Sequence, residues 1–256
     1  MSGRYRDDID NYSLNEEIYL DVPFVPTEEE VVDTMLELAN VGPKDVLYDL
    51  GSGDGRILVS AAKDWGARGV GIEIDPTRIA EAAEYAELSQ VDDLVVFVED
   101  DLFTADLSEA TAVTLYLLQS INEQLRPRLL TELRPGTRIV SHAFDMGAWK
   151  ADESRKVGSV NIYKWIVPAD VAGMWEWERA GRSYRVDLQQ SYQDVSGDAW
   201  VDERHARLKS AELRGRWLRV EIQDSEDAQP ESFSIEFGKN GLRSVVARGH
   251  ASANAG

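Results

Sequence analysis

Residues 46–56 read Val-Leu-Tyr-Asp-Leu-Gly-Ser-Gly-Asp-Gly-Arg and constrain the fold more than any other part of the chain. An apolar run containing Asp49 leads to Gly51, Gly53 and Gly55, and an apolar segment with helical spacing follows. Because glycine has no Cβ, a ligand can approach the backbone of such a turn, and the next helix offers free N–H groups. The spacing is neither the dinucleotide-binding Gly-x-Gly-x-x-Gly nor a P-loop. We expect a buried strand, a tight turn and a helix, with a ligand at the turn.

Two further acids stand where later apolar runs end. Glu73 closes the run at 69–73, and Asp101 follows the run at 94–98. An acid about 20 residues beyond a glycine turn is placed to accept hydrogen bonds from a ribose. The glycines alone could form a tight turn without a ligand, but their combination with Asp49, Glu73 and Asp101 favours a ribose-bearing ligand.

Apolar strands alternate with helical segments up to residue 168, which predicts an α/β fold with a mostly parallel sheet covered on both faces. A capping box formed by Thr27 and Glu30 predicts the first helix, and Ser120 with Glu123 predicts another, interrupted at Pro127. The expected strands lie at 46–50, 69–74, 94–98, 112–118 and 137–143, and the other expected helices lie at 55–64 and from 76 onward. Strands at 155–157 and 160–167 predict an antiparallel hairpin at the end of the sheet.

After Pro168 the pattern changes to short alternating runs with turn signals between them. Residues 172–249 therefore predict a second, antiparallel β domain that curls into a sandwich or small barrel. Its tryptophans are expected in its core or at its contact with the first domain: Trp175, Trp177, Trp200 and Trp217. Residues 1–20 are expected to form an arm on the main domain at 21–168, and residues 250–256 a tail.

The composition limits the partners. With 47 acidic and 27 basic residues the net charge is −20, which disfavours nucleic acids because these are held by Lys and Arg on phosphates. The acidity suits a basic protein segment or an amine, although a saline habitat or solubility explains it equally well. There is no cysteine, and the three histidines lack metal-ligand spacing. No signal peptide or membrane span is recognised, so the cytoplasm is the default expectation.

These motifs resemble those of the class I S-adenosylmethionine-dependent methyltransferases, with residues 49–55 as the first motif. The resemblance implies that the glycine loop faces the methionine part of the cofactor, Glu73 the ribose and Asp101 the adenine. A narrower resemblance, carried by 22–27, 49–56, 101–103 and 113–118, is to relatives of the mitochondrial lysine methyltransferases that act on the ATP synthase c-ring protein and on the adenine nucleotide translocase. It implies that Phe24, Pro26 and Thr27 fold over the cofactor. The full set expected to bind S-adenosylmethionine is Phe24, Pro26, Thr27, Asp49, Gly51, Ser52, Gly53, Gly55, Glu73, Ile74, Asp100, Asp101, Leu102 and Tyr116.

Three residues are candidates for contact with the methyl acceptor: Tyr116, His142 and Asp145. Each has a plainer alternative, namely a core aromatic ring, a histidine bonded to a carbonyl and the cap of a turn. The sequence after the fourth strand lacks the Asn/Asp-Pro-Pro-Tyr motif of nucleobase and glutamine methyltransferases, which argues against those acceptors.

The predicted function is methyl transfer from S-adenosylmethionine, most plausibly to nitrogen, with a protein lysine favoured by resemblance alone. One alternative is a small-molecule N- or O-methyltransferase with the β domain as a lid. Another is a cofactor-binding module without catalysis. Neither a metal nor a membrane anchor is expected, and the sequence leaves the oligomeric state open.

Overall fold

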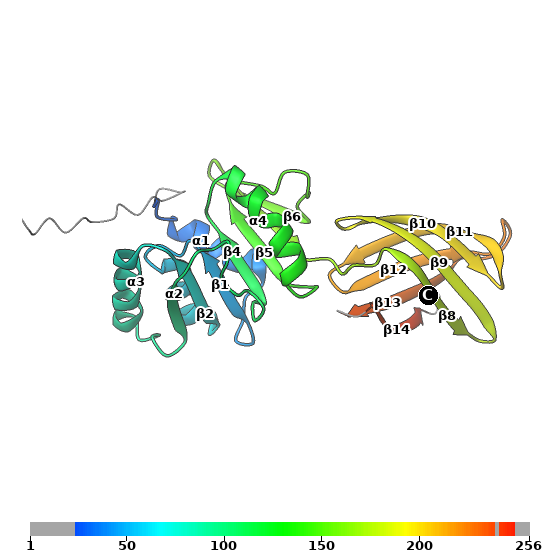
Figure 1. Ribbon diagram of the computed structural model, residues 1–256, viewed down its shortest axis with the longest axis horizontal. Coiled ribbons are helices and arrows are strands. Elements are labelled where there is room, and N and C mark those ends of the chain that lie inside the picture. Colours follow the sequence, from blue (N-terminus) through cyan, green and yellow to red (C-terminus); the bar gives the residue numbers. More distant parts are fainter. Residues whose placement is uncertain (1–23, 239–240, 249–256) are drawn as a thin grey trace, which may run out of the picture.

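The computed structural model describes residues 24–238 and 241–248. Within them the chain forms two sheets, one after the other, and the two domains lie end to end along the longest axis of the molecule (Figure 1). The arm predicted at 1–20 and the tail predicted at 250–256 lie outside the described residues, as do Val22 and Pro23 of the proline-containing motif.

The first sheet has the order β3-β2-β1-β4-β5-β7-β6, with parallel pairs from β3 to β5 and antiparallel pairs at β7 and β6. This confirms the predicted Rossmann-like class with a closing hairpin. The strands are β1 Val46–Leu50, β2 Arg68–Glu73, β3 Val95–Glu99, β4 Ala112–Leu115, β5 Arg138–His142, β6 Glu153–Val157 and β7 Val160–Ile166, and the helices are α1 Glu29–Ala39, α2 Arg56–Trp65, α3 Pro76–Leu88 and α4 Gln119–Glu132.

Strand β1 is central, and all five of its residues are buried. Leu47 belongs to the apolar cluster that also contains residues of α1 and α2, whereas Leu50 belongs to the cluster that contains residues of α4. Alternate side chains of a strand point to opposite faces, so this division shows that both faces of the sheet are covered. The covering layers leave the carboxyl ends of the strands free to form a site.

The two predicted capping boxes were wrong. The residue before α1 is Glu28 and the residue before α4 is Leu118, and neither helix start has a side-chain cap. Thr27 is buried, and its carbonyl oxygen instead accepts a hydrogen bond from Arg56 at 2.9 Å. Helix α4 also continues through Pro127. A proline there removes one backbone hydrogen bond, but burial of the helix face on both sides of it outweighs that loss.

The second sheet is an antiparallel meander whose strands follow the chain order. Its strands are β8 Gly173–Arg179, β9 Arg182–Ser191, β10 Asp194–Val201, β11 Arg204–Arg214, β12 Trp217–Gln223, β13 Glu231–Gly238 and β14 Gly241–Arg248. The sheet curls on itself, because rings from its first strands contact rings from β13. Trp175 meets Phe237 edge-on at 5.1 Å between centroids, and Trp177 and Tyr184 both pack on Phe233.

Trp175 and Trp177 therefore pack against the core of the C-terminal domain, as predicted. Trp217 is 46% exposed and lies outside that core, and Trp200 is partly buried between His205 and Arg185. A tryptophan of the first domain, Trp149, takes part in the contact between the domains, by stacking on Tyr192.

Two hairpin turns of the C-terminal domain lie on the first domain. The turn between β9 and β10 bonds to Trp149 and Lys150. In the turn between β11 and β12, the Gly215 carbonyl accepts a hydrogen bond from Ala169, and a Cβ on Gly215 would lie 3.0 Å from the Cα of Gly136. Contact at two separate turns fixes the orientation of one domain against the other.

We predict that Phe233→Ala lowers the free energy of unfolding by about 3–5 kcal/mol, because Phe233 is fully buried between two aromatic rings and truncation leaves a cavity. Urea denaturation followed by tryptophan fluorescence measures the loss. Val246→Ala, at a side chain that is 55% exposed on β14, is the control and should change little. Equal losses in the two variants would contradict this packing of the core.

Candidate functional site

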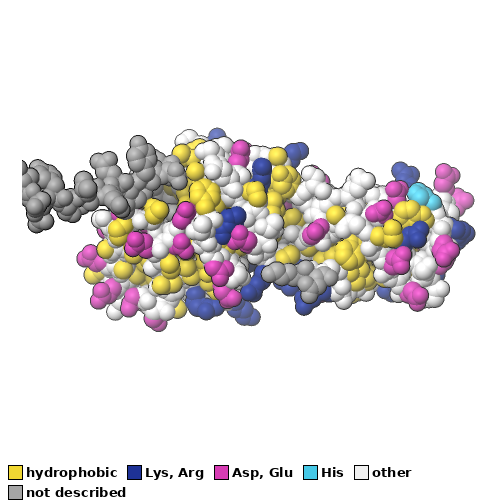
Figure 2. All heavy atoms as spheres, viewed as in Figure 1, with side chains coloured by type: hydrophobic (Ala, Val, Ile, Leu, Met, Phe, Trp, Pro, Cys, Tyr) yellow, Lys and Arg dark blue, Asp and Glu magenta, His cyan; other side chains and the backbone are white. Residues whose placement is uncertain are grey.

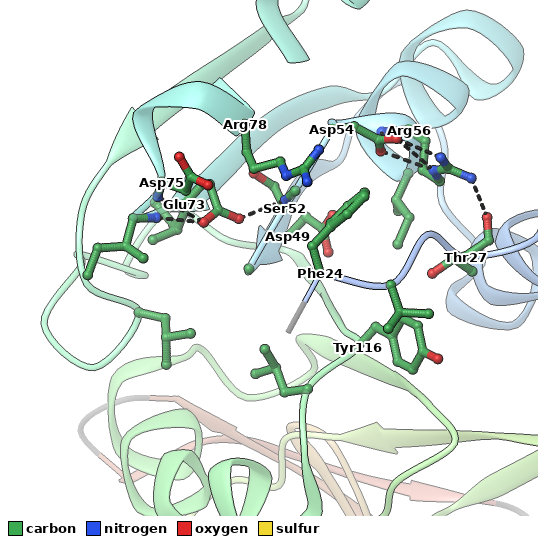
Figure 3. A pocket seen from close by; sticks show the side chains of 18 of the residues that line it. Phe24, Thr27, Asp49, Ser52, Asp54, Arg56, Glu73, Asp75, Arg78 and Tyr116 are labelled. Carbon is green, nitrogen blue, oxygen red and sulfur yellow. Dashed lines mark hydrogen bonds and ion pairs between the residues drawn. The ribbon is translucent and has the colours of Figure 1, made fainter. Parts of the chain in front are cut away.

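A cavity of about 410 Å³ lies at the carboxyl ends of β1 to β4 (Figure 3). Ligands of open parallel sheets bind at this edge. Of the fourteen residues that the sequence assigned to the cofactor, every one but Gly55 lines the cavity. Its lining comprises Phe24, Val25, Pro26, Thr27, Asp49, Gly51, Ser52, Gly53, Asp54, Arg56, Ile57, Ile72, Glu73, Ile74, Asp75, Arg78, Asp100, Asp101, Leu102, Phe103, Tyr116, Leu117 and Ile121.

The glycine turn after β1 needs residues without a Cβ. Gly51, Gly53 and Gly55 have φ of 78°, 53° and 76°, a left-handed region that side chains disfavour. A Cβ on Gly53 would lie 2.5 Å from the ring of Phe24, and one on Gly55 would lie 2.6 Å from the ring of Phe97. Gly55 thus shapes the start of α2 from behind the cavity wall, whereas Gly51 and Gly53 line the cavity.

Glu73 holds the edge of the site together. One of its carboxylate oxygens accepts the Gly53 N–H at 2.8 Å, and the other accepts the N–H groups of Ile74 and Asp75 at 2.9 and 3.0 Å. Asp75 in turn caps α3 by accepting the Thr77 N–H. The carboxylate therefore ties the glycine loop to the end of β2 while one side of it lines the cavity.

Asp49 is an ionisable group in an unfavourable place. Its side chain is only 3% exposed, and the Thr114 hydroxyl donates to it at 2.8 Å. Burial, reinforced by the neighbouring charges of Glu73 and Asp54, raises the pKa of Asp49 to about 7 despite that hydrogen bond. An apolar residue would cost less here, so a carboxyl group in the cavity wall is suited to a cationic ligand.

The segment before α1 closes over the glycine loop. The guanidinium of Arg78 lies 4.0 Å from the centre of the Phe24 ring, and the two side chains lie beside each other in Figure 3. The guanidinium of Arg56 donates to the Asp54 carboxylate at 2.6 Å and also to the carbonyl oxygen of Thr27, so it connects the two residues. Arg78 and Asp54 were not among the predicted site residues. The only available signal was their position in the first turn of α3 and in the glycine motif.

At the far end of the cavity, acids lie beside apolar side chains. Asp101 accepts the Phe103 N–H at 2.8 Å and Asp100 accepts the Asp101 N–H at 2.8 Å, which forms a tight turn after β3. Ile74, 43% exposed, and Leu102 also line the cavity. Carboxylates beside apolar side chains can bind a flat ring that carries an amino group.

The acceptor candidates divide into two groups. Tyr116 lines the cavity, across from Glu73 and Asp75 in Figure 3, and the ring of His142 stacks on it with centroids 3.7 Å apart. Burial lowers the pKa of His142, and its Nδ1 has no hydrogen-bond partner among the described residues. Asp145 lies outside the lining, where its carboxylate accepts the Gln119 amide at 2.7 Å and the Gly147 N–H at 2.8 Å.

Within the part of the chain that the structure describes, no group of acidic or histidine side chains is arranged to hold a metal ion. Among the same residues, no helix has the length and apolarity needed to cross a membrane.

Comparison with known proteins agrees with this geometry. The family model of the ANTKMT methyltransferase domain matches residues 49–153. A protein-lysine N-methyltransferase of Saccharolobus islandicus is 46% identical over 151 residues, which span 57% of this chain and 94% of that relative. The adenine nucleotide translocase lysine N-methyltransferase of Mus musculus is 30% identical over 131 residues, which span 51% of this chain and only 57% of that relative.

Among solved structures, one described as an RNA methyltransferase from Salinibacter ruber in complex with S-adenosyl-L-homocysteine is 56% identical. The match covers 57% of this chain and 96% of that one, with a TM-score of 0.57. The matched relatives thus correspond to little more than half of this chain. On the strength of these matches and of the cavity at the glycine turn, the chain belongs to the ANTKMT methyltransferase family and is an S-adenosylmethionine-dependent methyltransferase.

Proposed function

We propose that this enzyme methylates lysine side chains of proteins. The observation that carries the proposal is the charge of the cavity, to which the described residues contribute six carboxyl groups and two guanidinium groups. One of those two, Arg56, is paired with Asp54. Such a cavity attracts a sulfonium and an ammonium ion and disfavours phosphate. The Saccharolobus islandicus relative, described as a protein-lysine N-methyltransferase, supports the same acceptor.

In this proposal, different residues of the cavity bind different parts of S-adenosylmethionine. Asp49 and the glycine loop hold the methionine part, because a carboxyl group complements an ammonium and residues without a Cβ let the ligand approach the backbone of the loop. Glu73 accepts the ribose hydroxyls on the side of its carboxylate that faces the cavity. Asp101, with Ile74 and Leu102 beside it, receives the adenine. Phe24, Pro26 and Thr27 cover the cofactor from the direction of α1.

The wall of the cavity that contains Tyr116 and Ile121, here called the acceptor wall, is then left for the methyl acceptor. Methyl transfer forms a carbon–nitrogen bond as the carbon–sulfur bond breaks, and the sulfur leaves as a neutral thioether. The lysine ammonium first releases a proton to solvent, which exposes the lone pair of the amine. We propose that Tyr116 contacts the amine. His142, kept neutral at neutral pH by burial, supports the Tyr116 ring without placing a second cation beside the ammonium.

RNA is the second candidate acceptor, because the Salinibacter ruber structure is described as that of an RNA methyltransferase. The net charge of −20 argues against it, and acidic side chains are spread over both domains on the face shown in Figure 2. A small-molecule amine is the third candidate, and its capture needs no extended surface.

The acceptor class is tested by incubating the enzyme with a native lysate and S-adenosylmethionine labelled on its methyl group. We expect the label in the protein fraction, resistant to ribonuclease, and recovered as methyl-lysine after acid hydrolysis. Label confined to RNA or to the small-molecule fraction would overturn the proposal and identify the alternative.

We predict that Asp49→Asn stabilises the cofactor-free protein and weakens cofactor binding. The pKa of Asp49 is about 7 in the folded protein against 3.8 in the unfolded chain, so its ionisation opposes folding. Its contribution to stability therefore falls as the pH rises from about 4 to about 7 and is constant above that range. At pH 8 the variant should gain about 2–4 kcal/mol in the free energy of unfolding.

Calorimetry with S-adenosylmethionine at several pH values completes this test. A cation next to Asp49 favours its charged form, so the affinity of the parent should rise with pH between about 6 and 8, and Asp49→Asn should lose that dependence. Asp45→Asn is the control of opposite sign, because hydrogen bonds from Arg138 and Thr111 outweigh burial and lower the pKa of Asp45. Loss of stability in both variants would contradict the account.

We predict that Glu73→Gln raises the dissociation constant for S-adenosylmethionine about tenfold to a hundredfold, because hydrogen bonds to a charged group are each worth about 1.5–3 kcal/mol. Calorimetry measures it, and circular dichroism checks that the fold is intact. Glu84→Gln, at an exposed residue of α3, is the matched control. An affinity within about twofold of the parent would show that Glu73 only fastens the glycine loop.

We predict that Tyr116→Phe, which keeps the ring in the cavity wall, and His142→Ala reduce the rate of methyl transfer about tenfold or more while the affinity for S-adenosylmethionine changes little. The two variants act on the acceptor wall, because the His142 ring supports that of Tyr116. Steady-state rates at saturating cofactor, set beside calorimetric affinities, separate the two effects. Rates equal to that of the parent would remove both residues from the acceptor site.

A further inference from the structure

The family model matches residues 49–153, and the C-terminal domain begins well beyond that range. Its contact with the first domain includes one short turn. Strand β9 ends at Ser191 and β10 begins at Asp194, and these two residues pair, so the loop between them is Tyr192-Gln193 alone. Two-residue turns of this kind favour Asn-Gly, because the chain must adopt positive φ.

Tyr192 nevertheless has a φ of 56°, where a bulky side chain is disfavoured. Gln190 supports the turn by donating to the carbonyl oxygens of Tyr192 and Ala169 at 2.7 and 2.9 Å. A residue that is poorly suited to the turn thus stands where its side chain meets the catalytic domain, and we take this as a sign that the side chain itself is used.

The turn is bonded to one loop of the catalytic domain, residues 143–150, here called the bracing loop. The Tyr192 ring stacks on that of Trp149, with centroids 6.0 Å apart and an angle of 13° between the planes. Trp149 Nε1 donates to Gln193 Oε1 at 3.0 Å, and Gln193 Nε2 donates to the Lys150 carbonyl at 2.8 Å. Trp149 is fully buried. The side-chain amide of Gln193 therefore bonds to the bracing loop through both its oxygen and its nitrogen.

The other end of the bracing loop is bonded to the acceptor wall. Gln119 donates to the Asp145 carboxylate at 2.7 Å and accepts the Asp145 N–H at 3.2 Å. Asn122 donates to the carbonyl oxygens of Phe144 and Asp145. Both Gln119 and Asn122 belong to the first turn of α4, and Ile121, between them, lines the cavity together with Tyr116.

A continuous chain of contacts thus runs from the C-terminal domain to the cavity. We infer that the turn Tyr192-Gln193 is a positioning element for the methyl acceptor: through the bracing loop it fixes the wall that Tyr116 and Ile121 present, and leaves the cofactor side unaffected. This inference rests on the proposed function for the location of the acceptor. None of the contacts involves the glycine loop, Glu73 or Asp101, so cofactor affinity is expected to be independent of the turn.

The same contacts explain the position of Asp145. One oxygen of its carboxylate, Oδ1, accepts both the Gln119 amide and the Gly147 N–H, and Asp145 lies outside the residues that line the cavity. Gln119 and Asp145 therefore hold the bracing loop against α4 and act as positioning residues, like Gln193.

The test uses the full chain with Gln193→Ala, and Gln189→Ala as matched control, because Gln189 is an exposed residue on the strand that leads into the turn. The rate of methyl transfer from labelled S-adenosylmethionine into lysate protein is measured at saturating cofactor, together with the KM for the cofactor and the affinity for S-adenosyl-L-homocysteine. Gln193→Ala should lower the rate about tenfold to a hundredfold, as expected for a misplaced acceptor site, and leave both cofactor constants within about twofold. Gln189→Ala should match the parent.

A second pair separates positioning from folding. Tyr192→Phe keeps the stacked ring and should retain the parent's rate, whereas Tyr192→Ala should behave like Gln193→Ala. Hydrogen exchange should rise in residues 143–150 of the impaired variants and stay unchanged in the glycine loop. An unchanged rate in Gln193→Ala, or a fall in rate matched by an equal loss of cofactor affinity, would overturn the inference.

Failure of the proposed function gives a different result. If the parent labels no protein, the acceptor proposal fails, and the same variants are compared for labelling of the RNA and small-molecule fractions. If the parent labels no fraction, hydrogen exchange alone tests the inference. Unchanged exchange in residues 143–150 of Gln193→Ala overturns it, and faster exchange confined to the bracing loop supports it.

Discussion

The hydrogen bond from the Gly53 N–H to the Glu73 carboxylate, 2.8 Å long, is the interaction on which the site depends. It closes the glycine turn of β1 against the end of β2, and Phe24 fills the space that a Cβ at position 53 would need. Once the turn is closed, Gly51, Gly53 and the carboxyl groups of Asp49 and Glu73 line a common cavity. The same bond explains why an acid follows the second strand: it fastens the loop and supplies a charged acceptor.

The buried carboxyl group of Asp49 in this cavity lowers the stability of the fold when it is charged. Asp49 is almost wholly buried, with Glu73 and Asp54 as neighbouring charges, and the pKa of Asp49 rises to about 7 in consequence. The helix and sheet layers would tolerate a neutral residue there. A carboxyl group in such a place stores unfavourable electrostatic energy that a cationic ligand releases on binding, which is the usual relation between stability and function at a binding site.

Much of this was predictable from the sequence, because it depends on order along the chain. Apolar strands that alternate with helices predict a parallel sheet, and acids at the ends of these strands then meet at one edge, so Asp49, Glu73 and Asp101 could be placed together. Bonds between distant side chains could not be predicted. Thr27 and Ser120 match a capping pattern. In the structure Thr27 is buried, and the residues that precede α1 and α4 are Glu28 and Leu118, so neither pattern forms a cap. The contact of Gln193 with Trp149 joins two domains and leaves no local pattern.

S-adenosylmethionine is expected to bind in the cavity at the glycine turn and nowhere on the C-terminal domain. Hydrogen exchange followed by mass spectrometry, with and without S-adenosyl-L-homocysteine, distinguishes the two locations, because exchange reports each segment separately. We expect slower exchange in residues 51–58, 73–77 and 100–104 and unchanged exchange in β8 to β14. Protection confined to the C-terminal domain, or none in residues 51–58 at saturating ligand, would contradict it.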